Sequence, residues 1–468
     1  MIGRTQKISG YSETSTQEVR TASEAHVGGQ TFMWITENNP TDSKVEHGLL
    51  ELIVSPANLN TAYEQVTRNK GAAGVDSMEV DSLKDYLLSH KEELIESILR
   101  GKYRPNPVRR VEIPKDDGSK RLLGIPTVID RMIQQAISQA LSPLYEAQFS
   151  PNSYGFRPNR NAHQALRKSR DYITEGYSYV VDLDLEKFFD TVNHSQLIEI
   201  LSRSIHDGRV ISLIHKYLNA GIQIGRNYES SHLGVPQGGP LSPLLSNIML
   251  NELDKELEKR GHPFVRYADD AMVFCKSQRG AERVMGNLVL FIEEKLRLKV
   301  NKKKSQVAYH RRVKFLGYSF YRMKGKCRLR IHPKSVAKME AQIKELTSRS
   351  NGWGNERRKE ELRQYITGWV NYFKLADIIR LLQKVDEWYR RRLRMVIWKQ
   401  WKRVRTRLTN LIKLGVKKSK AWEWANTRKG YWHIAKSYIL ATTLTNDRLR
   451  QAGYVFLSDY YRKVRVKT

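Results

Sequence analysis

The sequence is poor in cysteine and lacks long apolar runs. Cys275 and Cys327 are its only cysteines in 468 residues, so neither a disulfide framework nor a cysteine-based zinc site is expected. The 12 histidines are scattered without the spacing of metal ligands. No stretch of about 18 apolar residues and no signal-peptide pattern occur, so we expect no membrane contact. The expected compartment is the cytoplasm of a bacterium, or the matrix of an organelle if the gene is organellar.

Acidic residues are also few relative to basic ones. The chain has 81 Lys and Arg against 49 Asp and Glu, a formal net charge of +32. From Ile331 onward, 33 basic residues face 11 acidic ones, so +22 of this charge lies in the last third, together with eight of the nine tryptophans. A polyanionic partner is the default inference. Base stacking with phosphate neutralisation would use this composition, although core packing is the preferred explanation for most of the tryptophans, because each buries a large area.

Residues 264–275 predict two short apolar strands that fold back on each other. Asp269 and Asp270 lie where the chain turns. Because Asp is a common turn residue for local reasons, a solvated hairpin tip is the plain alternative to a functional site.

A second apolar segment, residues 179–186, also carries carboxylates. Side chains alternate along a strand, so Asp182 and Asp184 would share one face. Two strands that bring Asp184, Asp269 and Asp270 together would form an oxygen-ligand site suited to Mg²⁺. Paired ions in such a site serve the in-line phosphoryl transfer of polymerases.

Three segments in this order resemble motifs A, B and C of reverse transcriptases: Asp184–Asp190, Gly234–Pro243 and Tyr267–Asp270. The resemblance is strongest to bacterial group II intron reverse transcriptases, intron-encoded proteins with maturase activity, and runs from about residue 49 to near the C-terminus. Residues 368–373, Gly-Trp-Val-Asn-Tyr-Phe, resemble the maturase thumb block and favour intron proteins over retroviral enzymes. Many family members end in a Cys-rich HNH endonuclease domain, which the low cysteine count leads us not to expect here.

The resemblance implies an α+β right-hand polymerase. Fingers and palm with an antiparallel sheet would be followed by an α-helical thumb and a small basic C-terminal helical region. The expected divisions are a disordered tail (1–45), an N-terminal extension (46–100), fingers and palm (101–328), a thumb or maturase X domain (329–400) and a basic DNA-binding region (401–468).

The same resemblance implies an RNA-directed DNA polymerase that also acts as a maturase in intron splicing and mobility. Its partners would be the group II intron RNA, an RNA template with a DNA primer, target DNA and dNTPs. Two Mg²⁺ ions, with Mn²⁺ as a substitute, would be held by Asp184 and Asp269, with Asp270 completing the acidic cluster and the Leu185 carbonyl assisting. Asp184 is preferred to Asp182 because the family's ligand lies five residues before an aromatic that crowds the ribose 2′ position.

That aromatic is Phe189, which would act as a steric gate favouring dNTP over rNTP; its alternative is a core side chain. Asp-Gly between apolar segments predicts a hairpin over residues 111–125, with Lys115 and Arg121 on opposite arms. In the family such a basic pair clamps the incoming triphosphate, while solvated surface charge is the alternative. Residues 291–305 resemble motif D of the family. Gln237 in motif B and Lys304 in this segment complete the proposed dNTP contacts.

The proposed template and primer contacts come from three segments. Residues 153–160 resemble a block that lines the template path, and solvated arginines are the alternative there. Residues 315–318 resemble the primer-grip turn, and the basic helix near residue 390 would track phosphates. The residues concerned are Arg157, Arg160, Gly317, Arg390, Arg391 and Arg394.

Two rival functions stay open. One is a splicing-only RNA-binding maturase, against which the intact carboxylates argue. The other is a domesticated reverse transcriptase in a defence or diversity-generating system, which the neighbourhood of the gene would reveal.

Overall fold

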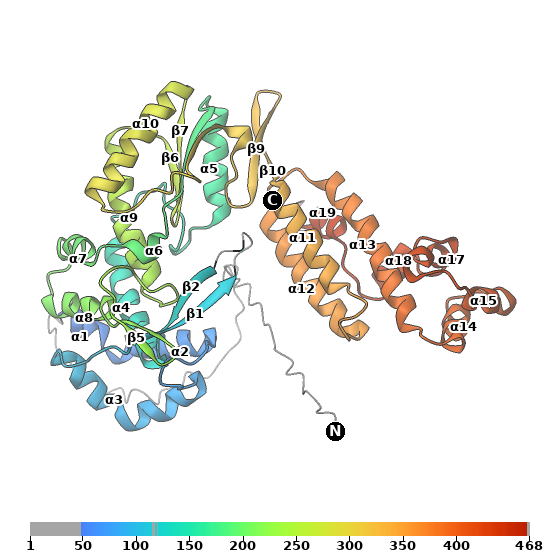
Figure 1. The fold of residues 1–468 in the computed structure, drawn as a ribbon, viewed down its shortest axis with the longest axis horizontal. Coiled ribbons are helices and arrows are strands. Elements are labelled where there is room, and N and C mark those ends of the chain that lie inside the picture. The colour runs from blue at the N-terminus through green and yellow to red at the C-terminus, as the bar shows by residue number, and fades with distance from the viewer. Residues whose placement is uncertain (1–47, 115–117, 119, 466–468) are drawn as a thin grey trace, which may run out of the picture.

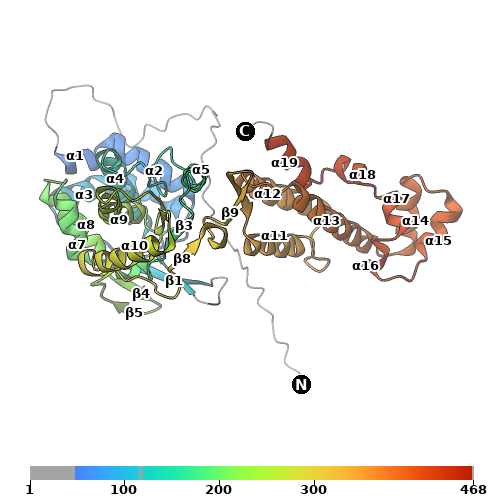
Figure 2. The same cartoon turned by 90° about the horizontal axis from the view of Figure 1, so that it is seen from above.

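The computed structural model describes residues 48–114, 118 and 120–465. The tail predicted for residues 1–45 and the proposed triphosphate contact Lys115 lie outside these residues. A broad half, which contains the chain to about residue 330, is followed by a narrow helical half that extends away from it (Figures 1 and 2). No helix in the described part of the chain has the length and apolarity needed to cross a bilayer.

The N-terminal part combines helices with a small sheet of strand order β2-β1-β4-β5. The predicted hairpin is confirmed, because β1 and β2 pair antiparallel with Ile113 opposite Arg121. The side chain of Thr127 caps the long helix α4 by accepting from Asp130 N. The elements are α1 (Leu49–Ile53), α2 (Pro56–Asn69), η2 (Val80–Ser82), α3 (Leu83–Leu99), β1 (Val108–Pro114), β2 (Lys120–Ile125), α4 (Val128–Glu146), α7 (His194–Ser202), α8 (Gly208–Leu218), β4 (Ile222–Ile224) and β5 (Asn227–Glu229).

The palm is an antiparallel sheet of order β6-β7-β3-β8. Successive side chains of its strands point to opposite faces of the sheet, so each face packs against a hydrophobic core of its own. Val181 and Val273 belong to the core shared with the N-terminal helices, whereas Val180 and Phe274 belong to the core shared with the thumb. The elements are α5 (Ala162–Thr174), β3 (Tyr179–Leu183), α6 (Phe188–Thr191), α9 (Ser242–Lys259), β6 (Phe264–Tyr267), β7 (Asp270–Cys275), α10 (Gln278–Leu290), η3 (Phe291–Lys295), β8 (Gln306–Tyr309) and η4 (His310–Arg312).

A hairpin of two strands leads into the helical half. Three long helices form the thumb, and shorter helices follow at the far end (Figure 2). The elements are β9 (Tyr318–Met323), β10 (Lys326–Ile331), α11 (Pro333–Leu346), α12 (Asn355–Phe373), α13 (Ile379–Gln400), α14 (Val404–Lys413), α15 (Lys418–Ala425), α16 (Tyr431–Ile434), α17 (Tyr438–Thr443), α18 (Asn446–Gln451) and α19 (Leu457–Arg465). The expected α+β class, with an antiparallel palm and a helical thumb, is confirmed.

The last helix makes contacts across the domain boundary expected at residue 401. α19 returns to the thumb, where Leu457 N and Ser458 N each donate a 2.9 Å hydrogen bond to the Asp386 carboxylate. Tyr461 Oη donates to Ala376 O at 2.6 Å. The C-terminal region is thus folded against the thumb at its end, and the expected domain boundaries stay predictions.

Candidate active site

Adjacent central strands of the palm bring the predicted carboxylates together. In the register of β3 and β7, Leu183 pairs with Ala271, so Asp184 and Asp270 follow directly at the same end of the two strands. Asp182, opposite Met272, lies two residues earlier and on the same face as Asp184. The sequence separates these groups by more than 80 residues, and the pairing of the strands removes that separation.

Asp269 lies in the turn between β6 and β7. Tyr267 pairs with Asp270, which leaves Ala268 and Asp269 as a two-residue hairpin loop. Ala268 has φ +57°, a value that favours glycine, so this turn stores backbone strain. The hairpin predicted from the sequence is confirmed, and its tip carries Asp269 next to the ends of β3 and β7.

The negative charges of these carboxylates repel one another, and this repulsion contributes to the raised pKa values of two of them. Desolvation by the surrounding protein, followed by the charges of Asp269, Asp182 and Asp184, raises the pKa of Asp270 to about 7. Burial also raises the pKa of Asp182 to about 6, and the Asp184 charge adds to this. Asp270 is nevertheless solvent-exposed, at the first position of β7. Water screens part of the repulsion there.

These donors fit a divalent cation. Carboxylate oxygens are hard ligands, and Mg²⁺ is usually bound by one or two carboxylates with water and substrate phosphates supplying the rest. Within the described ranges, no three His, Cys, Asp or Glu side chains form a group that could hold a metal ion by itself, so water and substrate phosphates would have to complete the coordination here. A bound cation would relieve the repulsion that raises the pKa of Asp270.

A loop before β8 holds Asp184 from the other side. Asn301 Nδ2 donates to Asp184 Oδ2 at 2.8 Å, and Asn301 N donates to Asp184 O at 2.9 Å. Asp184 N donates to Ser305 Oγ at 3.0 Å. Leu185 forms an isolated bridge with Val300 in the same loop. Sequence reasoning assigned no role to Asn301 or Ser305; the resemblance of residues 291–305 to motif D indicated the segment but pointed only to Lys304.

Phe189 lies on the short helix α6 directly after these acids. It is half-buried, its ring packs edge-on against Phe188 with centroids 5.2 Å apart, and its carbonyl accepts from Val235 N at 2.6 Å. At Gly234, φ is +92° and a Cβ would come within 2.9 Å of Phe189 O. The motif-B-like loop is therefore fitted closely onto the backbone of the proposed steric gate.

The same loop contacts the small sheet of the N-terminal part. Gln237 O accepts from Gly124 N of β2 at 2.7 Å. A Cβ on Gly238, whose φ is +119°, would lie 2.8 Å from Gly124 O. Gln237 is thus placed between motif A and β2, while Arg121 on β2 and Lys304 are exposed. The nucleotide contacts proposed for these three residues stay predictions.

Arg157 differs from both expectations stated for it. Its side chain is only 3% exposed and pairs with Glu146 at 2.6 Å. It also donates to Ser150 O at 2.6 Å and Ser153 O at 2.8 Å, so a phosphate contact would require it to leave this site. Arg160 is half-exposed, lies over the ring of Tyr154, with the guanidinium carbon 5.5 Å from the ring centroid, and keeps its predicted role open.

Gly317 lies in a tight turn at the junction of palm and thumb. Leu316 and Gly317 both have positive φ, +49° and +79°, and Phe315 and Tyr318 exchange two backbone hydrogen bonds across them. Tyr372 of α12 donates to Leu316 O at 3.0 Å. The turn resembling a primer grip is present, and the thumb fixes it; its contact with a primer stays a prediction.

The arginines of α13 are engaged within the protein. Arg394 donates to Leu444 O at 2.9 Å and to Asn446 Oδ1 at 3.1 Å. Arg391 donates to Trp432 O at 3.0 Å and lies 3.8 Å from that ring's centroid. Arg390 lies 5.5 Å from the centroid of Phe456. These contacts connect α13 to the C-terminal helices. Each side chain would have to break its contact to bind a phosphate.

Two family models match the chain. Residues 113–320 match "Reverse transcriptase (RNA-dependent DNA polymerase)", and residues 336–415 match "Group II intron, maturase-specific domain". The first range includes the three motif-like segments, and the second includes the block at 368–373. Reverse transcriptases generally use divalent metal ions, in keeping with the acidic site.

Named relatives agree with these matches. "Protein YkfC" of Escherichia coli is 42% identical over 219 residues, which cover 45% of this chain and 57% of that protein. "Group II intron-encoded protein LtrA" of Lactococcus lactis is 30% identical over 336 residues, which cover 58% of this chain and 56% of that protein. The chain thus spans little more than half the length of these relatives.

Among solved structures, a chain of "Partial Cas6-RT-Cas1--Cas2 complex" shares 27% sequence identity and a TM-score of 0.35. That alignment covers 53% of this chain and 43% of the other. Residues 113–320 are therefore similar to reverse transcriptases and residues 336–415 to the group II intron maturase-specific domain, and the chain is similar over 336 residues to a group II intron-encoded protein.

Proposed function

We propose that the protein is an RNA-directed DNA polymerase that extends a primer 3′ end on an RNA template. The observation that carries the proposal is the placement of Asp184 and Asp270 at the same end of two paired strands, with Asp269 in the adjoining turn. This arrangement brings hard oxygen ligands together at one end of the sheet. The dNTPs, the RNA template and the DNA primer are the proposed substrates.

Asp184, Asp269 and Asp270 would hold two Mg²⁺ ions, with help from the Leu185 carbonyl and with Mn²⁺ as a substitute. When bound, such ions supply charge stabilisation for in-line phosphoryl transfer. The residues of the chain orient this site: Asn301 fixes one oxygen of Asp184, and the loop at Gly234 fixes the backbone of Phe189. Phe189 would then exclude a ribose 2′-hydroxyl by its bulk.

Primer extension tests the polymerase. We would measure dTTP incorporation on poly(rA)/oligo(dT) with Mg²⁺ by the wild type, Asp269→Asn and Asp270→Asn. Incorporation by the wild type that disappears in both variants supports the proposal. A folded, RNA-binding wild type without incorporation would overturn it and leave the splicing-only maturase.

We also propose that the protein binds its group II intron RNA and assists splicing and mobility at a DNA target. The maturase-specific match over residues 336–415 favours this second activity, and the basic character of the last third of the chain suits a polyanion. Splicing of RNA transcribed from the sequence flanking the gene, with and without protein at low Mg²⁺, tests it. Because relatives occur in Escherichia coli and, as "Nuclear intron maturase 2, mitochondrial", in Arabidopsis thaliana, we propose a bacterial cytoplasm or an organelle matrix as the compartment.

A further inference from the structure

A buried ion pair lies directly behind the turn that carries Asp269. Arg266 on β6 donates from Nε to Asp254 Oδ1 at 2.8 Å and from Nη2 to Asp254 Oδ2 at 2.6 Å. The two side chains are 1% and 0% exposed. Removing two charges from water is costly, and buried pairs are often no better for stability than apolar residues. A pair in this place therefore points to a positional role.

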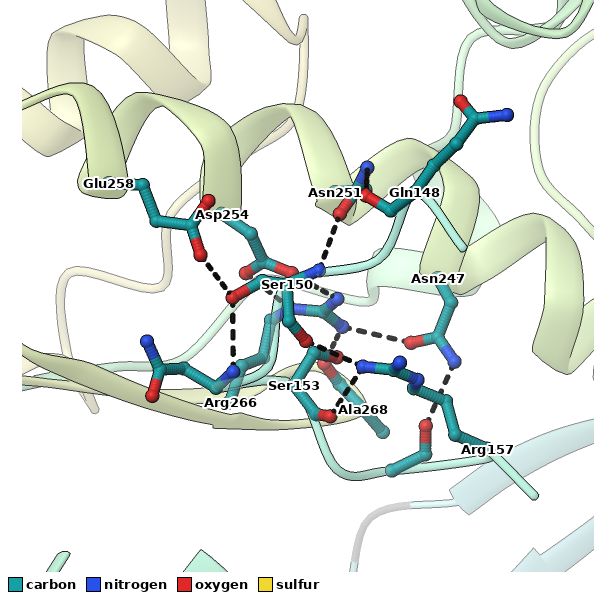
Figure 3. Close-up of polar contacts among 12 residues, drawn as sticks. Gln148, Ser150, Ser153, Arg157, Asn247, Asn251, Asp254, Glu258, Arg266 and Ala268 are labelled. Carbon is teal, nitrogen blue, oxygen red and sulfur yellow. Dashed lines mark hydrogen bonds and ion pairs between the residues drawn. The ribbon is translucent and has the colours of Figure 1, made fainter. Parts of the chain in front are cut away.

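The third guanidinium nitrogen provides that role. Arg266 Nη1 donates to Ala268 O at 2.9 Å and to Asn247 Oδ1 at 3.0 Å. Ala268 is the residue with φ +57°, and its carbonyl joins it to Asp269. The hydrogen bond therefore acts on the peptide unit that precedes Asp269, at the one strained position of the turn. Figure 3 shows the guanidinium between Asp254, Asn247 and Ala268.

A second contact surface confines the same turn. Asn247 Nδ2 donates to Gly155 O at 2.8 Å, and a Cβ on Gly155 would lie 2.2 Å from Ala268 N. The backbone at Gly155 thus lies directly against the turn, with no room for a side chain. Arg266 and Asn247 connect both of these backbones to α9.

Backbone hydrogen bonds hold the outer edge of β6 against the segment at residues 152–154. Arg266 N donates to Asn152 O and Tyr154 N donates to Arg266 O, both at 2.9 Å. Buried Arg157 in turn binds the carbonyls of Ser150 and Ser153 (Figure 3). The segment that was expected to contact the template by its arginine therefore supports β6.

We propose that Arg266, oriented by Asp254, is a positioning residue that fixes the Ala268–Asp269 turn and thereby the metal-binding geometry of Asp269 and Asp270. The inference rests on the proposed function for its metal site but concerns a different group of residues. Lysine cannot replace Arg266 in this role, because one ammonium group cannot reach both oxygens of Asp254, the Ala268 carbonyl and Asn247 together.

The test uses the full chain and measures metal binding apart from catalysis. Mn²⁺ binding is followed by electron paramagnetic resonance for wild type, Arg266→Lys and Asp269→Asn, the last to identify the signal of this site. We expect Arg266→Lys to weaken Mn²⁺ binding about tenfold or more, as loss of a supporting partner does at other metal sites. It should also raise the Mg²⁺ concentration for half-maximal primer extension by a similar factor.

Arg358→Lys is the matched control, because Arg358 is also buried, at 2% exposed, but lies on α12 of the thumb. It should lower the melting temperature without changing Mn²⁺ affinity. Ala268→Gly combined with Arg266→Lys should recover part of the lost affinity, since glycine adopts the positive φ without strain. A purely structural role for Arg266 predicts no such recovery.

Wild-type Mn²⁺ affinity in Arg266→Lys, or an equal loss in Arg358→Lys, would overturn the inference. If Arg266→Lys does not fold, Asn247→Ala serves instead, because it deletes one acceptor of Nη1 and leaves the ion pair intact; it should weaken Mn²⁺ binding in the same direction, and unchanged affinity would contradict the inference. Mn²⁺ binding that depends on Asp269 without primer extension by the wild type would overturn the proposed polymerase and leave the inference standing.

Discussion

The side-chain amide of Asn301 donates a 2.8 Å hydrogen bond to one carboxylate oxygen of Asp184, although 117 residues separate the two in sequence. The bond occupies Oδ2 and orients the carboxylate at the end of β3. Asn301 also binds the Asp184 carbonyl through its backbone. The loop before β8 thus determines how a proposed metal ligand is presented.

Asn301→Ala should raise the Mg²⁺ concentration for half-maximal primer extension about tenfold, because Asp184 loses the partner that orients it. Asn301→Asp should raise this Mg²⁺ concentration further, since it adds a negative charge beside Asp184. Magnesium titrations of primer extension measure both effects. Asn426→Ala, an exposed amide that binds Trp422 O, is the control, and equal behaviour of all three variants would contradict the assigned role.

Phe189→Val should increase the use of rNTPs relative to dNTPs by about tenfold or more, because a smaller side chain leaves room for a 2′-hydroxyl. The ratio of kcat/KM for rTTP and dTTP on poly(rA)/oligo(dT) measures this selectivity. Unchanged discrimination, with dTTP incorporation retained, would show that Phe189 is only a core residue.

Gly238→Ala should impair dNTP use more than Gly176→Ala. Both glycines have positive φ, +119° and +105°, so both variants incur backbone strain of about 1 kcal/mol or more. Only at Gly238 would the new Cβ meet another backbone atom, Gly124 O, at 2.8 Å, whereas nothing lies within 4 Å at Gly176. Steady-state KM for dTTP separates the clash from the strain, and equal KM values would contradict the proposed fit.

Arg394→Ala should reduce stability, whereas Arg405→Ala should weaken RNA binding. Arg394 binds Leu444 O and Asn446 Oδ1, so its loss should lower the melting temperature and leave RNA affinity of the folded protein nearly unchanged. Arg405 is exposed, and if it binds a phosphate its loss should reduce the slope of log affinity against log salt by about 0.7 on single-stranded RNA. Filter binding to single-stranded RNA across salt concentrations measures the slopes.

Asp386→Asn should detach α19 from the thumb. The carboxylate accepts from Leu457 N, Ser458 N and Ser458 Oγ, and an amide leaves one buried partner unsatisfied at a cost of about 1–3 kcal/mol. Urea unfolding measures the loss. Asp447→Asn, which removes an exposed pair with Arg450, should change stability by less than about 1 kcal/mol, and equal losses in both variants would contradict the docking role.

The sequence by itself located the acidic segments of the proposed site. Alternating apolar and acidic residues indicated a strand at 179–186, and two apolar runs around Asp269 indicated a hairpin, because strand periodicity and turn preference are local properties. The order of the three motif-like segments then indicated the resemblance to reverse transcriptases and the α+β class. Local pattern also gave the hairpin opposite Arg121 and the helices of the thumb.

Only the tertiary structure decided which polar residues support the site. Arg157 lies in a polar segment that indicated an exposed loop, yet its side chain is buried against Glu146. Arg266 looks like one more basic residue in a strand, yet it binds Asp254 and the turn at Ala268. Asn301 reaches Asp184 from 117 residues away. Such partners are chosen by burial and long-range packing, because a buried donor must find an acceptor wherever the fold brings one, and no local pattern encodes that choice.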